Sequence, residues 1–402
     1  MTLVTKFLTD SERQAIRAPI EKARTFPRRA FTDSEYYEFE LEYALRESWV
    51  AVGFSPTLPN VGDVVPMTIL GCPVILVRGK DTKIRAFHNV CPYDGCEVSI
   101  SRQSGLDQIV TPYHGWHYDL GGRLIKAGYW DGTPDAESLN LKTLNANLKE
   151  IPCHEWFQTI FIYLGNNLVA FDQQFKTVLD HLSEIDLEQV QMGSGDQGQP
   201  LIQELKIASN WKTVYANYSP NVYHESFVHE MYRKSPHSPR VDENANKTYT
   251  EINSKCGFLG LCYDNEIGGS FYGDSKLPRI KNKDGSDNKI NTIANVYPNW
   301  VVTMLGDAAR IAIFLPEGPG LGTQVVGTYF HQDAAHDEAF LMDRKQSERK
   351  GIMARIEDNR ICESIQRARH APPFETQFYS PFWDNMHYTM NNLILDKLEQ
   401  AK

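Results

Sequence analysis

The chain has 402 residues, of which 41% are hydrophobic and 23% are charged, so it is long enough for two ordinary globular domains. Its formal net charge is -10, with no sustained run of lysine or arginine, which argues against nucleic acid as a partner. No apolar run approaches the roughly 20 residues that cross a bilayer, and the first residues lack a signal-peptide core. We therefore expect no membrane association and a cytoplasmic location.

The N-terminal part predicts helices followed by a small β domain. Residues 11–22 and 33–46 have helical patterns, with candidate cap residues at 32–35. From Trp49 to Tyr163, short alternating runs are broken by glycine and proline, which is typical of an antiparallel β domain, and Gly121-Gly122 predicts a tight turn. We assign residues 1–46 to helices that pack on a catalytic domain, and residues 47–165 to the β domain.

Residues 166–402 predict a larger domain that mixes helices and strands. Residues 175–187 have a helical pattern, and strand-like runs follow after residue 291. A long amphipathic stretch over 337–369 predicts a helix that ends before Pro372-Pro373. The predicted fold class is therefore α+β, with a small antiparallel β domain ahead of a larger mixed domain.

Two sets of motifs carry the chemistry. The first is Cys91-Pro92-Tyr93-Asp94-Gly95, with Thr111-Pro112-Tyr113-His114-Gly115-Trp116 further on. The second is Asn210-Trp211-Lys212, then Asn217, Tyr223-His224 and His229, with an acidic stretch around Asp358. Two imidazoles and one carboxylate on one face of Fe(II) leave positions open for oxygen and substrate. Because His224 and His229 would diverge by about 140° on a regular helix, convergence on one metal requires a broken helix.

Together these motifs resemble the Rieske-type non-heme iron oxygenase alpha subunits, in particular the aromatic-ring-hydroxylating and choline-monooxygenase-like branches. The resemblance implies a Rieske-like β domain and a helix-grip catalytic domain, in which an antiparallel sheet wraps a long C-terminal helix. It implies a mononuclear Fe(II) bound by His224, His229 and Asp358, and a homotrimer. Asn221 and Tyr223 are the expected catalytic neighbours, with the Asn221 side-chain amide holding the tautomer of His224.

The chain departs from the family at positions that serve electron transfer. Two cysteines and two histidines hold a Rieske [2Fe-2S] cluster, and of these positions Cys91 and His114 match, whereas Tyr93 replaces a histidine and Thr111 replaces a cysteine. Asn221 also stands where the family has a bridging acid. We therefore predict that the [2Fe-2S] cluster is absent. The substrate would then supply the electrons for oxygen activation, in cleavage, desaturation, cyclisation or dioxygenation.

Two alternatives stay open. The chain is a Rieske oxygenase with rewired cluster ligands, for which His88, Cys96 and His117 are available beside the two loops; or it is a non-catalytic or regulatory partner, assembled with a paralogous oxygenase subunit. For the main interpretation we expect a small organic or natural-product substrate. The residues expected to line its pocket, apolar or cation-binding, are Tyr215, Asn217, Tyr218 and Phe227.

Overall fold

The computed structural model describes residues 3–132, 134, 144–218, 221–233, 240–264 and 276–401. The chain forms two compact units, of which the larger contains residues 1–48 and 167–402 and the smaller contains residues 49–166. The predicted fold class is confirmed: each unit is built on antiparallel sheets, and the larger one adds a long C-terminal helix.

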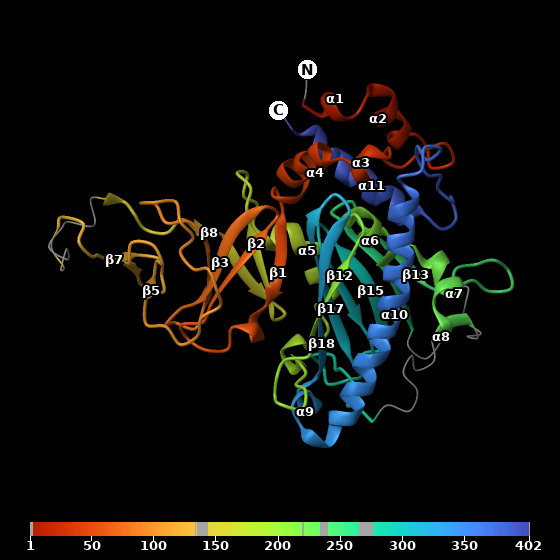
Figure 1. The fold of residues 1–402 in the computed structure, drawn as a ribbon. Coiled ribbons are helices and arrows are strands. Elements are labelled where there is room, and N and C mark those ends of the chain that lie inside the picture. Colours follow the sequence, from red (N-terminus) through yellow and green to blue (C-terminus); the bar gives the residue numbers. More distant parts are fainter. Residues whose placement is uncertain are drawn as a thin grey trace. The chain divides into compact units, whose positions relative to one another are not determined.

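The smaller unit contains three antiparallel sheets (Figure 1). The first is β1 (Trp49–Phe54), β10 (Thr159–Tyr163) and β9 (Cys153–Trp156); the second is β2 (Val64–Ile69), β3 (Cys72–Arg78), β4 (Ile84–His88) and β8 (Glu150–Ile151); the third is β5 (Ile109–Val110), β6 (Trp116–Tyr118) and β7 (Leu124–Ala127). The predicted turn at Gly121-Gly122 joins β6 to β7. Gly122 has φ +78°, and a Cβ there would lie 2.5 Å from the ring of Phe87, so the turn requires glycine.

The larger unit contains a sheet of eight strands, all paired antiparallel. Their order is β11 (Val190–Met192), β18 (Leu321–His331), β17 (Ala309–Gly318), β16 (Trp300–Met304), β15 (Ile290–Val296), β14 (Phe258–Asp264) and β13 (Thr250–Asn253), while β12 (Ile202–Ile207) also pairs with β18. Helix α10 (Leu341–Ala368) runs along this sheet (Figure 1) and lies within the predicted range 337–369.

The other helices of the larger unit are short. They are α1 (Val4–Phe7), α2 (Asp10–Arg17), α3 (Arg29–Thr32), α4 (Ser34–Glu40), α5 (Phe171–His181), α6 (Trp211–Tyr218), α7 (Glu225–Val228), α8 (Glu230–Arg233), α9 (Gln332–Ala335) and α11 (Asn385–Glu399), with a π-helical turn η1 (Leu41–Leu45) and 3-10 turns η6 (Val222–His224) and η7 (Glu338–Phe340). The predicted cap before residue 36 is present, because the Asp33 carboxylate accepts from the Tyr36 amide at 2.8 Å. Among the described residues, no helix is both long enough and apolar enough to cross a membrane.

The Asn210-Trp211-Lys212 motif anchors α6 inside the larger unit. The Asn210 side chain caps the helix by accepting from the Lys212 amide at 3.0 Å. The Lys212 ammonium is buried and donates to Glu40 on α4 at 2.6 Å, while the Trp211 indole donates to the same carboxylate at 3.1 Å. Removing either charge would leave the other buried without its partner, so this pair fixes α6 and the segment that follows it.

Candidate metal centre

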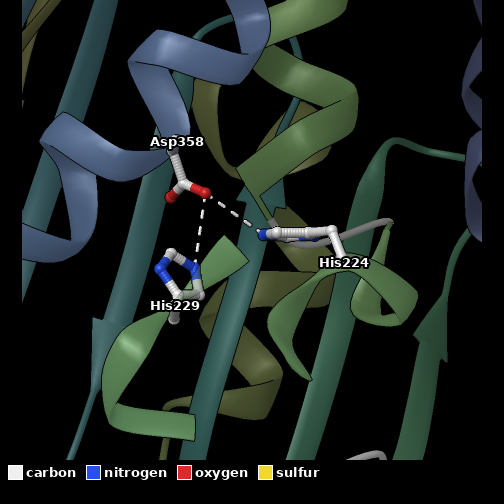
Figure 2. A group of neighbouring side chains, drawn as sticks. All are labelled: His224, His229 and Asp358. Carbon is white, nitrogen blue, oxygen red and sulfur yellow. Dashed lines mark ion pairs between the residues drawn. The ribbon is translucent and has the colours of Figure 1, made fainter. Parts of the chain in front are cut away.

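His224, His229 and Asp358 come together at the end of a broken helix. His224 ends η6, and His229 follows the single turn of α7 in an extended conformation, with φ -88° and ψ 118°. This break is the one that convergence of two imidazoles five residues apart requires. Asp358 reaches the same point from the middle of α10, and Figure 2 shows the three side chains pointing toward one another.

The geometry of this triad fits a metal ion. One ligand atom from each of the three residues lies within 4.8 Å of the others. The Asp358 Oδ1 atom is 3.2 Å from His224 Nε2 and 3.3 Å from His229 Nε2, yet it is buried without a partner in hydrogen-bond geometry. No more than 14% of any of these side chains is exposed. A buried carboxylate oxygen that faces two ring nitrogens without hydrogen bonds is the arrangement that a bound cation would complete.

The remaining ring nitrogens are held by other groups. His229 Nδ1 lies 2.9 Å from Glu357 Oε2, and His224 Nδ1 contacts the backbone carbonyl of Asn221. Both partners accept a proton from Nδ1, which leaves the lone pair of Nε2 for a metal. The expectation that the Asn221 side-chain amide holds the tautomer of His224 is wrong, because the backbone carbonyl oxygen of Asn221 makes the contact. Glu357, one residue before Asp358, is thus the partner of His229.

Electrostatics favour a positive charge at this point. Burial disfavours the imidazolium of His224, but the ion pair with Asp358, together with Glu225 and the Asn221 carbonyl, outweighs burial and raises the pKa of His224. A metal ion would replace that proton. Fe(II) bound here would supply open positions at which oxygen and substrate meet, while the chain's own residues orient the imidazoles and exclude water.

A cavity of about 110 Å³ adjoins the triad. Of the four residues expected to line it, Tyr218 does so. Tyr215 is buried and donates its hydroxyl to the Gly257 carbonyl at 3.0 Å, Asn217 borders a separate cavity, and Phe227 is 64% exposed. Tyr223, expected to be catalytic, is 49% exposed and stacks on Trp383 with ring centroids 5.2 Å apart. These positions place the exposed aromatic rings outside the cavity lining.

Several residues that line the cavity were not predicted from the sequence. They include Glu225, Arg310, Gly351 and Arg355. A signal existed for two of them. Arg310 is a charged residue followed by a run of apolar residues in strand β17. Arg355 lies three residues before Asp358, on the same helical face.

The two loops of the smaller unit have similar turns. In each loop, a glycine with a left-handed backbone conformation donates its amide hydrogen to the carbonyl four residues earlier. Gly95 donates to Cys91 at 2.9 Å, and Gly115 donates to Thr111 at 3.2 Å. Burial raises the pKa of the Cys91 thiol, while the backbone amides of Tyr93 and Asp94 favour its thiolate. The Cys91 sulfur is thus buried and lies near two backbone N–H groups of its own loop, which could support a metal-bound thiolate there.

The other loop positions make different contacts. The Thr111 hydroxyl accepts from the Trp116 amide at 2.9 Å, and Tyr93 stacks on Trp116 with ring centroids 4.9 Å apart. His114 Nδ1 lies 2.5 Å from Asp94 Oδ2, and although burial opposes it, this contact lowers the pKa of Asp94. Two thiolates and two imidazoles are therefore not assembled at the four family positions. His117, an expected alternative ligand, instead contacts Gln108 at 2.9 Å, and His88 lies on β4.

Sequence comparison identifies the family to which this two-unit fold belongs. Residues 192–400 match the family "Ring hydroxylating alpha subunit (catalytic domain)", and residues 48–137 match the family "Rieske [2Fe-2S] domain". Because the first match covers more than half of the chain, this protein belongs to the ring-hydroxylating alpha-subunit family of oxygenases. The resemblance seen in the motifs is thus confirmed.

Individual relatives refine this assignment. The chloroplastic choline monooxygenase of Arabidopsis thaliana is 27% identical over 381 residues, which cover 92% of this chain and 82% of the relative. The carnitine monooxygenase oxygenase subunit of Escherichia coli K12 is 29% identical over 206 residues, covering 49% of this chain and 50% of the relative. Several curated relatives are thus matched over only about half of their length.

Solved structures show the same fold. The quaternary ammonium Rieske monooxygenase CntA, in complex with an inhibitor, has a TM-score of 0.74 at 19% identity, covering 96% of this chain and 98% of that chain. Naphthalene 1,2-dioxygenase from a Rhodococcus species, bound to indole, has a TM-score of 0.70 at 17% identity, covering 94% and 95%. At these identities the likeness concerns the fold alone.

These comparisons overturn two predictions. The smaller unit matches the Rieske [2Fe-2S] domain family, and the relatives are monooxygenases, so a cluster is expected in the smaller unit, against its predicted absence. The prediction that oxygen activation proceeds without a cluster, on electrons from the substrate, is wrong for the same reason. Both predictions rested on Tyr93 and Thr111, which replace two family ligands. The family match depends instead on the whole of residues 48–137.

Proposed function

We propose that this chain is the oxygenase component of a Rieske-type monooxygenase that oxidises a small organic substrate at a mononuclear iron. The observation that carries the proposal is the triad, in which a buried Asp358 oxygen faces the Nε2 atoms of both histidines. The relatives named for choline and carnitine support a small amine-related substrate. In this proposal His224, His229 and Asp358 bind the iron, and Glu357 with the Asn221 carbonyl hold the two imidazoles.

For the smaller unit, we propose a cluster with altered ligands. Cys91 and His114 retain the family positions, and the donors nearest to them along the loops are Asp94 and Cys96. Asp94 already contacts His114 at 2.5 Å, and the Cys96 carbonyl accepts from the Cys91 amide at 2.7 Å. The family match supports a cluster in this unit, and Cys96 is among the alternative ligands that the sequence predicts, whereas Asp94 is added by its contact with His114.

Metal and sulfide analysis tests both parts together. The chain is purified without oxygen, with Fe(II) and sulfide supplied, and we expect about three irons and about two acid-labile sulfides per chain. Cys91→Ala should lose the sulfide and keep one iron, whereas His224→Ala should keep the sulfide and lose one iron. One iron with no sulfide would contradict the altered cluster and leave the mononuclear site standing. Sulfide without the third iron would contradict the mononuclear site.

Activity is tested with an electron-donating reductase. We expect at least one of the compounds named for the relatives, choline or carnitine, to gain one oxygen atom, detected by mass spectrometry, and His224→Ala to abolish the product. Gln346→Ala, at an exposed position on α10, serves as the control. If the chain is active only when mixed with a second oxygenase subunit, and His224→Ala leaves that activity unchanged, the proposal fails in favour of a partner role.

The assembly is a further part of the proposal. We propose a homotrimer, supported by the family resemblance. Size-exclusion chromatography with multi-angle light scattering measures the mass of the purified assembly directly. A monomer or a dimer at micromolar concentration would contradict it.

A further inference from the structure

Two buried arginines line the cavity that contains the triad. Their charge is opposite to that of the carboxylates in the same lining. Arg310, on β17, is 5% exposed, and Arg355, on α10, is 7% exposed. The cavity that contains the triad is lined by both of them. Long cationic side chains are seldom this deeply buried unless an interaction stabilises them.

The position of Arg310 is built into the fold. Its Nη2 atom donates to the Ser347 carbonyl at 2.8 Å and to the Ser347 hydroxyl at 3.0 Å, both on α10. A Cβ on Gly351 would lie 2.4 Å from Arg310 Nε, so any larger residue would require the guanidinium to shift from its place against the helix. A glycine in a helix interior costs about 1 kcal/mol relative to alanine. Glycine at this position therefore lowers helix stability but allows the Arg310 guanidinium to reach the cavity wall.

Arg355 belongs to the same face of α10 as the iron ligand Asp358. Residues three apart on a helix are neighbours, so the guanidinium and the carboxylate both face the cavity. The Tyr218 hydroxyl also lines this cavity, is buried, and has no hydrogen-bond partner among the described residues. The cavity therefore offers two guanidinium groups and an unsatisfied hydroxyl.

The two acids that line the cavity already face groups of the protein that can carry positive charge or bind a cation. Glu225 accepts from Arg240 Nε at 2.6 Å, and Asp358 lies between the two imidazoles. A divalent metal at the triad would add more positive charge. Among the described residues of the lining, Tyr218 is the only aromatic residue, apart from the histidine rings, that could face a quaternary ammonium group. The lining thus favours an anion over a cation.

We infer that the substrate of this cavity carries a carboxylate, which Arg310 and Arg355 bind while the Tyr218 hydroxyl donates a further hydrogen bond. A planar guanidinium matches the two oxygens of a carboxylate, which gives both orientation and strength. Binding at this end directs the other end of a small molecule toward the triad. The inference rests on the proposed function, since it names the substrate class of the same iron site. A zwitterion meets this requirement, whereas choline, which has no carboxylate, does not.

Four compounds of matched shape separate the effect of the carboxylate from that of the ammonium group. Glycine betaine and choline share the trimethylammonium group. In 3,3-dimethylbutyrate and 3,3-dimethylbutanol an uncharged tert-butyl group takes its place, while the carboxylate and the hydroxyl are kept. Each is titrated by calorimetry into the Fe(II)-loaded protein without oxygen, in a buffer free of carboxylates. We expect each carboxylate to bind at least about 10-fold more tightly than the alcohol of the same shape.

Variants assign that preference to the arginines. Arg355→Gln and Arg310→Gln should each reduce the carboxylate preference toward unity, and Arg355→Lys should retain part of it because it keeps the charge and loses the fork. Arg360→Gln, at an exposed position on α10, should keep the full preference. Circular dichroism checks the fold of the Arg310 variant, and the Arg355 variant tests the same point without disturbing the contact with Ser347.

Three results would overturn the inference: alcohols that bind as tightly as the carboxylates, a preference that survives in both glutamine variants, or no carboxylate binding at all. The titration requires no turnover. If the proposed oxygenase activity fails, the carboxylate preference still stands or falls by itself. If the preference fails, the iron and sulfide content still decides the proposed function.

Discussion

The triad of the larger unit and the two loops of the smaller unit differ in whether their polar side-chain atoms have hydrogen-bond partners. At the triad, the Asp358 Oδ1 atom is buried between two ring nitrogens with no hydrogen bond of its own. In the loops, the Thr111 hydroxyl bonds to the Trp116 amide, and His114 pairs with Asp94. A bound cation would complete the first arrangement, whereas the second satisfies much of its hydrogen bonding internally.

This difference shows how a ligand set can be judged from its surroundings. Residue types alone suggested that the loops had lost their cluster, yet the domain as a whole matches the Rieske family. At the triad, both the residue types and their surroundings indicate a metal site, because Glu357 and the Asn221 carbonyl orient the two imidazoles. A metal site is therefore best tested by changing its ligands and their supporting groups separately.

The largest effect is expected at the carboxylate of the triad. Asp358→Asn removes the charge that faces both imidazoles, and we expect Fe(II) affinity to fall by more than about 100-fold, beyond the loss usual for a supporting residue. Iron bound per chain after dialysis measures this. Asp343→Asn, the same change on the same helix, is the control. Full iron binding by Asp358→Asn would remove Asp358 from the ligand set.

A smaller effect is expected at Glu357, which positions His229. Glu357→Ala removes the acceptor at Nδ1, and we expect Fe(II) affinity to fall by about 10- to 100-fold. Glu357→Gln keeps an acceptor oxygen and should recover most of that loss. A purely structural role would instead lower the free energy of unfolding in both variants without separating their iron affinities.

Iron binding should also depend on pH. The pKa of His224 is raised, so its imidazolium persists to a higher pH than the ordinary value of about 6.5. A metal must displace that proton, so affinity should be full above this pKa and fall about 10-fold per pH unit below it. Anaerobic Fe(II) titrations between pH 5.5 and 8 measure the slope. A constant affinity down to pH 5.5 would contradict the prediction.

The smallest effect concerns the loops. Thr111→Val leaves the buried Trp116 amide without its acceptor, and we expect the smaller unit to lose about 1 kcal/mol of unfolding free energy. Urea unfolding measures this, and Thr111→Ser is the control because it keeps the hydroxyl. Sulfide content should be unchanged in Thr111→Val if the hydroxyl only supports the loop. Loss of sulfide from a folded Thr111→Val variant would make Thr111 a ligand and sharpen the altered-ligand proposal.

Local chemistry was readable from the sequence wherever a short segment decides its own conformation. The cap at Asp33, the turn at Gly122 and the long helix containing Asp358 follow from rules that act over a few residues. The fold class and the grouping of His224 with His229 and Asp358 followed from motif spacing and the family resemblance. The same attention to single ligand positions led to the wrong conclusion that the cluster is absent.

Tertiary structure alone decided what surrounds the triad. Arg310, on a strand, and Arg355, on a helix, are far apart in sequence, and the cavity brings them together because the sheet packs against α10. It also made the Asn221 carbonyl, rather than its side chain, the contact of His224, since the path of a broken helix sets which atom faces the ring. Sequence spacing specifies the residues of one element, whereas packing between elements determines which of their atoms meet.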